Sequence, residues 1–109
     1  MFIFAIMKKS LILKSKKEIG NLFVTGKSVS SGLVFAKVLS SDSTKFLFTV
    51  SSKKFKRAVD RNRIKRLMRE VSRKLVNVGN IKIAFIYTGT TLPTYREIES
   101  SINTIMGKI

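Results

Sequence analysis

The chain has 109 residues, 44% of them hydrophobic, and its 22 lysines and arginines against 6 aspartates and glutamates give a formal net charge of +16. This length and apolar content suit one folded domain and exclude a disordered basic tail, so we expect the charge to sit on a folded scaffold that faces a phosphate-rich partner. Cysteine and histidine are both absent, which excludes disulfides, thiolate metal sites, cysteine nucleophiles and the commonest general base.

The acids are scattered along the sequence, at Glu18, Asp42, Asp60, Glu70, Glu97 and Glu99. We therefore expect no catalytic residue and no metal site in this chain. The apolar run at residues 2–7 is too short for a membrane span, and cations follow it instead of preceding it as in a signal peptide. The prediction is one cytoplasmic domain over residues 1–109, with residues 1–10 as a poorly ordered N-terminal extension.

The first predicted element is a short helix that begins with a capping box. Ser15 is placed to cap the helix and Glu18 to reach back to the cap, and apolar residues follow at helical spacing until Gly26 ends the helix. A short strand is expected around residues 28–31. The segments 33–39 and 45–51, rich in β-branched and aromatic residues, flank a Ser-Ser-Asp-Ser turn, which predicts an antiparallel hairpin.

The second half of the chain alternates helix, strand and helix. Residues 56–77 have helical apolar periodicity, and the Gly-Asn pair at 79–80 is typical of a helix end. Residues 82–88 are mostly apolar, which predicts a central strand covered on both faces. A second capping box at residues 94–97 precedes a helix with one apolar face. The order αβββαβα predicts an α+β fold, a two-layer sandwich of one mixed sheet with helices packed on it.

Half of the positive charge is concentrated in residues 53–74, where eleven Lys or Arg stand against two acids. In a helix, Ile64, Leu67, Met68 and Val71 form a core-facing stripe. Opposite this stripe lie Asn62, Lys65, Arg66, Arg69 and Arg73. Mixed charge runs are usually solvated helix faces, but this run is almost entirely positive. Its cations repel one another, and binding to a polyanion would relieve the repulsion, so the pattern favours nucleic acid.

Residues 58–70, Ala-Val-Asp-Arg-Asn-Arg-Ile-Lys-Arg-Leu-Met-Arg-Glu, resemble the signature of the protein subunit of bacterial ribonuclease P. Residues 23–29 resemble the family's F-x-x-G-x-S-V segment, and residues 53–55 resemble its Lys-Lys-Phe approach to the basic helix. The resemblance covers residues 11–107. It implies an αβββαβα sandwich with a left-handed crossover through the basic helix, whereas general topology favours a right-handed crossover.

By this resemblance the chain is a non-catalytic protein cofactor of a ribozyme. The family's catalytic RNA removes the 5′ leader of precursor tRNA with Mg²⁺ held mainly by the RNA, while the protein binds that RNA and the single-stranded leader. The implied partners are the catalytic RNA and precursor tRNA, with no membrane and no small-molecule substrate. The residues implied to bind RNA are Lys53, Lys54, Lys56, Arg57, Arg61, Asn62, Arg63, Lys65, Arg66, Arg69 and Arg73.

The family's leader cleft lies between the first helix and the sheet, which here implies Ile19, Phe23, Phe35 and Lys37. The chain departs from the family pattern in having Ile19 where an aromatic residue is common and Lys37 where a tyrosine is common. Strand alternation puts Phe35 on the same sheet face as Lys37, so Phe35 is a second candidate for base stacking. Aromatic residues at such spacing are more often core, and that alternative stays open for both phenylalanines.

Other functions remain as alternatives. A ribosomal protein or general RNA chaperone with a similar sandwich would bind RNA without preferring tRNA that carries a leader. A nuclease acting without RNA would need clustered carboxylates, and a duplex-DNA binder would need helix-turn-helix spacing or dimerisation heptads, none of which the sequence contains. Asn62 stays open between an RNA contact, a hydrated-metal contact and a solvent-exposed side chain.

Overall fold

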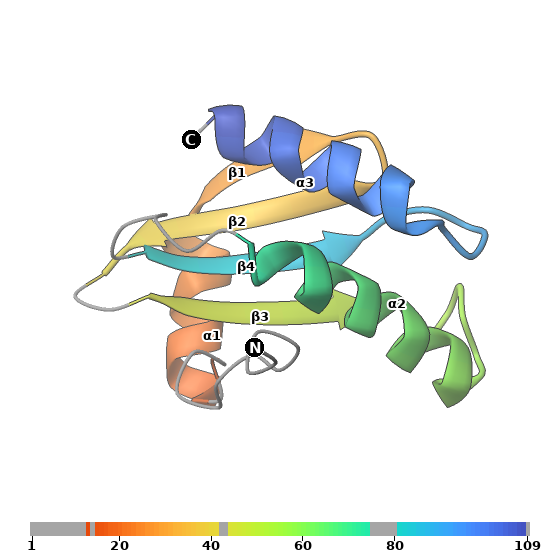
Figure 1. The fold of residues 1–109 in the computed structure, drawn as a ribbon. Coiled ribbons are helices and arrows are strands. Elements are labelled where there is room, and N and C mark those ends of the chain that lie inside the picture. Colours follow the sequence, from red (N-terminus) through yellow and green to blue (C-terminus); the bar gives the residue numbers. More distant parts are fainter. Residues whose placement is uncertain (1–12, 14, 42–43, 75–80, 109) are drawn as a thin grey trace.

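The computed structural model describes residues 13, 15–41, 44–74 and 81–108. In that part of the chain the elements are α1 (Lys16–Thr25), β1 (Lys27–Ser31), β2 (Val34–Ser40), β3 (Lys45–Val50), α2 (Ala58–Ser72), β4 (Ile81–Tyr87) and α3 (Tyr95–Lys108). This order, drawn in Figure 1, confirms the predicted αβββαβα arrangement and the α+β class. The predicted N-terminal extension, the centre of the Ser-rich turn and the helix stop at 79–80 lie outside the described residues.

The four described strands form one mixed sheet in the order β1-β2-β4-β3. β2 pairs antiparallel with β1 and β4, and β3 pairs parallel with β4. The predicted hairpin between residues 33–39 and 45–51 is therefore wrong, because β4 lies between these two strands. The reason is side-chain packing between the neighbouring strands β3 and β4. The Phe85 ring of β4 stacks on Phe46 and Phe48 of β3, with ring centroids 6.4 and 6.0 Å apart. That apolar contact between distant segments prevails over proximity in sequence.

The hairpin that does form joins β1 to β2 through a tight turn at Gly32. Gly32 has a φ of +53°, a left-handed conformation that glycine adopts without a steric penalty. The backbone N–H of Leu33 donates a hydrogen bond to the Ser101 hydroxyl of α3 at 3.2 Å. A Cβ at position 32 would lie 2.8 Å from the same hydroxyl oxygen. The turn therefore needs glycine for its dihedral angle and for the close approach of α3.

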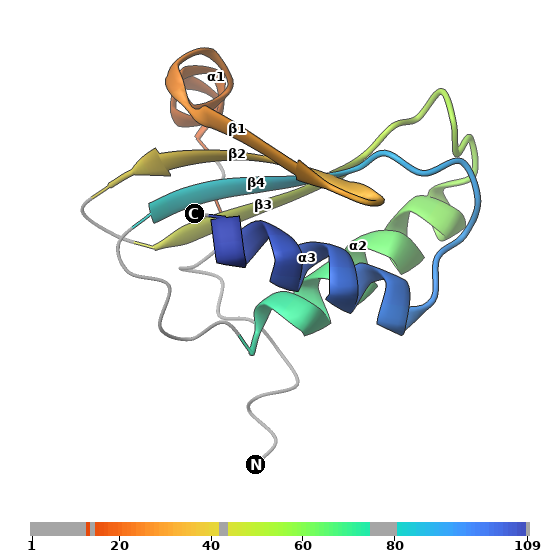
Figure 2. The same cartoon turned by 90° about the horizontal axis from the view of Figure 1, so that it is seen from above.

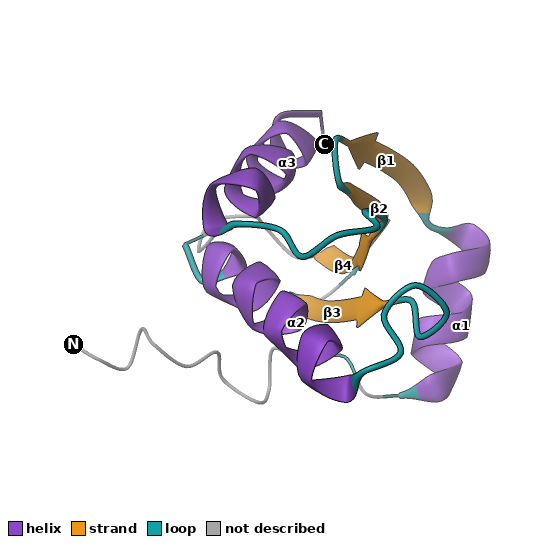
Figure 3. Cartoon of the chain, turned by 90° about the vertical axis from the view of Figure 1, so that its right-hand side faces the viewer, coloured by secondary structure: helices purple, strands orange, loops and turns teal. Residues whose placement is uncertain are grey.

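The helices α2 and α3 cover one face of the sheet, and α1 lies on the other face (Figures 2 and 3). The predicted apolar stripe of α2 is confirmed, since Ile64, Met68 and Val71 are buried against the sheet. The aromatic residues Phe46, Phe48, Phe85 and Tyr87 are buried in the same core. The predicted sandwich of a mixed sheet and packed helices thus holds for the α2–α3 side, and α1 adds a partial layer opposite.

Packing of α1 on the sheet forms a second, smaller apolar cluster. Leu22 of α1 is fully buried with Ala84 of β4, and the half-buried residues packed around them are Ile19, Phe23, Leu39 and Leu47. The predicted N-terminal cap is present, with the Glu18 N–H donating to the Ser15 hydroxyl at 3.4 Å. The Glu18 carboxylate lies 2.8 Å from Lys82 Nζ on β4, so this ion pair fixes the start of α1 over the sheet.

The connection from β3 through α2 to β4 is a left-handed crossover. β3 and β4 run parallel, and in Figure 1 β3 points to the right, α2 lies in front of the sheet and β4 lies above β3. A right-handed connection in that view would place β4 below β3. The structure therefore confirms the hand that the family resemblance implied and that general topology disfavours.

Candidate nucleic-acid interface

The outer face of α2 presents a stripe of polar and basic side chains. Asn62, Arg63, Arg66 and Arg69 are exposed, on the side of the helix opposite the buried core residues. This confirms the predicted division of α2 into an apolar side and a cationic side. Because the opposite side of α2 is packed in the core, Arg63, Arg66 and Arg69 stand at fixed positions, each three residues and about 4.5 Å of axial rise from the next. Such a row of fixed charges suits a phosphate backbone.

Arg61 lies outside this exposed stripe and has a different environment. Its Nη1 donates hydrogen bonds to the carbonyl oxygens of Phe55 at 2.8 Å and Lys56 at 2.9 Å. The side chain is half-buried, between the helix and the loop that precedes it. Arg61 therefore ties the approach loop to the first turn of α2, a structural contact that the sequence analysis did not foresee. Its predicted contact with RNA remains a prediction.

The approach loop, residues 51–57, is anchored by one buried aromatic side chain. Phe55 is buried and its ring packs on Tyr87, with centroids 5.8 Å apart and planes tilted by 45°. The neighbouring cations of the loop are exposed, namely Lys53, Lys54, Lys56 and Arg57. Lys54 Nζ donates to the Thr88 carbonyl oxygen at 2.9 Å, which links the loop to the end of β4. The loop thus extends the cationic surface of α2 to the end of the sheet.

Cations near the C-terminal end of α2 are held by neighbouring groups. The Arg69 guanidinium carbon lies 6.0 Å from the Phe48 ring centroid, and Arg73 lies 4.0 Å from the Glu70 carboxylate. Lys65, also predicted to bind RNA, is half-buried on the flank of the helix. A hydrogen bond with Tyr95 of α3 raises the pKa of Lys74 above its ordinary value. Among the exposed cations of α2, Arg63 and Arg66 therefore lie away from these contacts, near the middle of the helix.

The residues predicted to contact the leader lie on the α1 side of the sheet. Phe35 and Lys37 of β2 share that face, as alternation predicted, and Lys37 Nζ lies 6.0 Å from the Phe35 ring centroid. Both are half-buried, and so are Ile19 and Phe23, which pack on the small α1 cluster. Phe23 therefore contributes to the core while keeping part of its ring accessible. Binding of a leader by these four residues remains a prediction.

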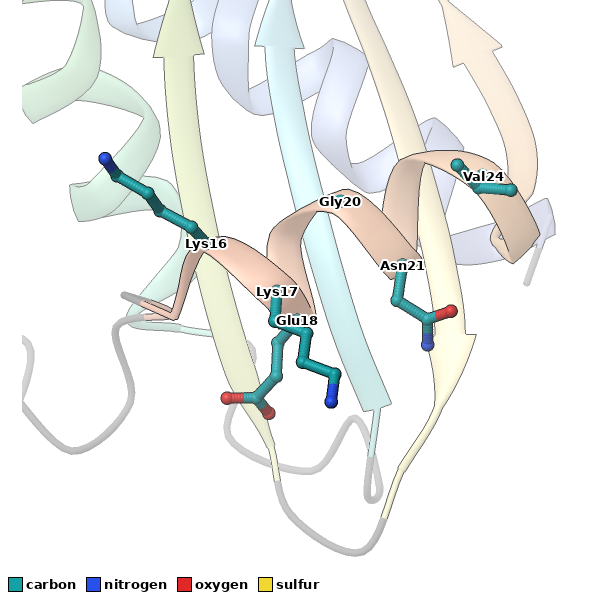
Figure 4. A pocket seen from close by; sticks show the side chains of 6 residues that line it. All are labelled: Lys16, Lys17, Glu18, Gly20, Asn21 and Val24. Atoms are coloured by element: carbon teal, nitrogen blue, oxygen red, sulfur yellow. The ribbon is translucent and has the colours of Figure 1, made fainter.

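Two surface hollows were not predicted from the sequence. One, of about 660 Å³, lies along the outer side of α1 and is lined by Lys16, Lys17, Glu18, Gly20, Asn21 and Val24 (Figure 4). The other, of about 520 Å³, lies on the outer face of α2 and is lined by Val59, Asn62, Arg63 and Arg66. Val59 is an apolar residue on the polar side of α2, and this break in the helical pattern is the signal in the sequence that would have singled it out.

The chemistry available in the described residues is that of cations and amides. Three of the described carboxylates are paired with cations, Glu18 with Lys82, Glu99 with Lys74 and Glu70 with Arg73, at 2.8, 3.8 and 4.0 Å. In residues 13, 15–41, 44–74 and 81–108, no group of three or more acidic, histidine or cysteine side chains is placed to hold a metal ion. Within the same residues, no helix combines the length and apolar character needed to cross a membrane. The arrangement is suited to binding phosphates and bases.

Comparison with known proteins gives a consistent result. The model of the ribonuclease P family matches residues 7–109. The ribonuclease P protein component of Chlorobium phaeobacteroides is 32% identical, over 94% of this chain and 87% of the relative. The structure of the Staphylococcus aureus RNase P protein is similar with a TM-score of 0.81 at 22% identity, covering 92% of this chain and 95% of that one. The structure of the Thermotoga maritima RNase P protein is similar with a TM-score of 0.79 at 18% identity, covering 90% of this chain and 96% of that one.

Proposed function

This chain belongs to the ribonuclease P family, whose model matches residues 7–109, and on that premise we propose that α2 binds the catalytic RNA while the α1 side of the sheet binds the 5′ leader of precursor tRNA. As a protein component of ribonuclease P, it acts in tRNA processing as a subunit of an endoribonuclease. None of the relatives reported above favours the ribosomal or chaperone alternative. Family membership implies an RNA partner; the two particular RNAs and the residues that meet them are our proposal.

The observation that carries the proposal is the one-sided charge of α2. Ile64, Met68 and Val71 fix one side of the helix in the core, so the exposed Arg63 and Arg66 are held in place before any partner binds. Cations held this way neutralise RNA phosphates with little ordering cost and release condensed counterions. Neutralisation lets the catalytic RNA and precursor tRNA approach each other, and so lowers the Mg²⁺ concentration that the reaction needs.

We further propose that the Mg²⁺ ions of the reaction are held mainly by the RNA. Mg²⁺ prefers oxygen ligands, and the described carboxylates do not converge on one point in the fold. Asn62 is exposed next to Arg63 and is free to reach an RNA group or a hydrated ion bound to RNA. The protein's contribution is then to bind and orient RNA, while bond cleavage takes place on the RNA.

The leader contact is proposed to combine stacking with charge. Phe35 offers a partly exposed ring, and the Lys37 ammonium beside it places a positive charge at the same point of the sheet face. Stacking of one base on an aromatic side chain contributes about 1–3 kcal/mol, and a nearby cation attracts the adjoining phosphate. Because mature tRNA lacks the leader, this contact favours precursor over product and lets product leave.

Cleavage assays test the proposed function directly. Precursor tRNA with a 5′ leader is incubated at low Mg²⁺ with bacterial ribonuclease P RNA, with this protein, or with both. We expect cleavage only when both are present, with a 5′ phosphate on the mature end. If the protein binds the catalytic RNA tightly but does not stimulate cleavage by its cognate RNA, the cofactor role is refuted and a general RNA-binding role takes its place.

The leader contact has its own test with a matched charge control. Lys37→Gln and Arg96→Gln each remove one cation, but Arg96 is exposed on α3, across the sheet from α1. In the assembled enzyme, Lys37→Gln and Phe35→Ala should weaken binding of precursor tRNA and leave binding of mature tRNA unchanged. Arg96→Gln should have little effect on either. Equal losses for precursor and mature tRNA would contradict a leader contact at this face.

A further inference from the structure

We infer that the hollow over Val59 on α2 receives one unpaired nucleobase of the RNA that this helix binds, an inference that rests on the proposed function. Val59 is 66% exposed, one of three large apolar side chains that the described residues leave exposed. It lies in the first turn of α2, where its neighbours on the same face are polar or charged. The side chain therefore presents an apolar surface at the N-terminal end of the cationic stripe.

Within the described residues, no apolar cluster accounts for valine at this position. Val59 takes no part in either apolar cluster, and β-branched residues are mediocre helix formers. A single exposed apolar residue needs no explanation by itself. Here, however, it forms the apolar part of a hollow of about 520 Å³ whose other lining residues are Asn62, Arg63 and Arg66. The spacing i, i+3, i+4 and i+7 puts all four on one stripe of the helix.

The chemistry of these four side chains selects a base over a phosphate. A phosphate gains nothing from contact with two methyl groups, whereas the face of a nucleobase is apolar. The Asn62 amide carries both a donor and an acceptor, which match the edge of a base. Arg63 and Arg66, one and two turns further along the helix, supply positive charge for the phosphates next to the same nucleotide. A base paired in an A-form duplex is inaccessible to such a helix face, so the base must be unpaired.

A salt titration distinguishes an apolar contact from a phosphate contact. Affinity for the catalytic RNA is measured from low to high salt for the wild type, Val59→Ser and Arg66→Gln. Val59→Ser should bind roughly tenfold more weakly at every salt concentration, with an unchanged slope, because burying a valine releases no counterion. Arg66→Gln should instead reduce the slope of log affinity against log salt by about 0.7–0.9. Val59→Ile, which keeps the apolar surface, should bind like the wild type.

Val24→Ser is the matched control, because Val24 is 82% exposed on α1, across the sheet from α2. It should bind the catalytic RNA like the wild type. Reagents that modify unpaired base edges should show a protected base in the wild-type complex that becomes reactive with Val59→Ser. Wild-type affinity for Val59→Ser, or an equal loss for Val24→Ser, would overturn the inference. If Arg66→Gln also leaves the slope unchanged, the proposed role of α2 fails as well, so the two failures are distinguishable.

Discussion

The two arginines of the Arg-Asn-Arg sequence should have separate roles, Arg61 in stability and Arg63 in RNA binding. Comparing the free energy of unfolding of Arg61→Ala with that of Arg63→Ala tests this. Arg61 Nη1 donates to two backbone carbonyls of the approach loop, at 2.8 and 2.9 Å, one part-buried and one exposed. Hydrogen bonds from a charged group contribute about 1.5–3 kcal/mol when buried and less at the surface, so their loss should cost about 2 kcal/mol in the free energy of unfolding. Arg63 is exposed on the outer face, and its replacement should cost less than about 0.5 kcal/mol.

The assay is thermal unfolding of the free protein, followed by circular dichroism at fixed ionic strength. For a chain of this size, about 2 kcal/mol corresponds to a fall in Tm of about 8 °C. Both variants remove one cation and place alanine in the same helix, so helix propensity and net charge cancel in the comparison. RNA binding should show the reverse order, with Arg63→Ala reducing the salt slope. Equal Tm values for the two variants would refute the structural role of Arg61.

Three further predictions concern the scaffold. Burial raises the pKa of Tyr87, with Glu97 as a second cause, and its hydroxyl donates to the Thr91 carbonyl oxygen at 2.6 Å. Because the pKa of Tyr87 in the folded state exceeds the unfolded value near 10, the stabilisation from its protonated hydroxyl is complete below about pH 10 and is lost above it. In alkaline solution the Tm of the wild type should therefore fall more steeply than that of Tyr87→Phe. Gly32→Ala should lower stability by about 1–2 kcal/mol in denaturant titrations, because alanine is strained at positive φ. Glu18→Gln, which removes the partly exposed Lys82 ion pair, should cost about 0.5 kcal/mol at low salt and less at 1 M salt.

Features set by local sequence were predicted correctly. The capping box at the start of α3 forms with both of its hydrogen bonds, from the Thr94 N–H to Glu97 at 2.9 Å and from the Glu97 N–H to Thr94 at 3.3 Å. The core-facing stripe of α2 was predicted because a 3.6-residue period repeats over several turns. Both features depend on residues three or four positions apart. A single sequence carries that information directly.

Features set by distant contacts were not predicted. The pairing of β3 with β4 depends on the stacked rings of Phe48 and Phe85, which are far apart in the chain. The loop contact of Arg61 depends on where the chain turns after Phe55, which is fixed by burial of that ring against Tyr87. In both cases the deciding contact joins segments that no local pattern connects. The left-handed crossover was expected only from the family resemblance, since the general rule predicts the opposite hand.

The separation of the two proposed RNA-binding surfaces argues for two RNA segments. The exposed stripe of α2 points away from one side of the sheet, while Phe35 and Lys37 lie on the other side with α1. The sheet and its side chains stand between them, so one straight RNA segment on either surface cannot touch the other. The cations of residues 53–57 lie in the loop that leads from the edge strand β3 to α2. A general RNA-binding protein would need only one charged face. A division into two surfaces suits the proposed role of holding a catalytic RNA and the leader of its substrate at the same time.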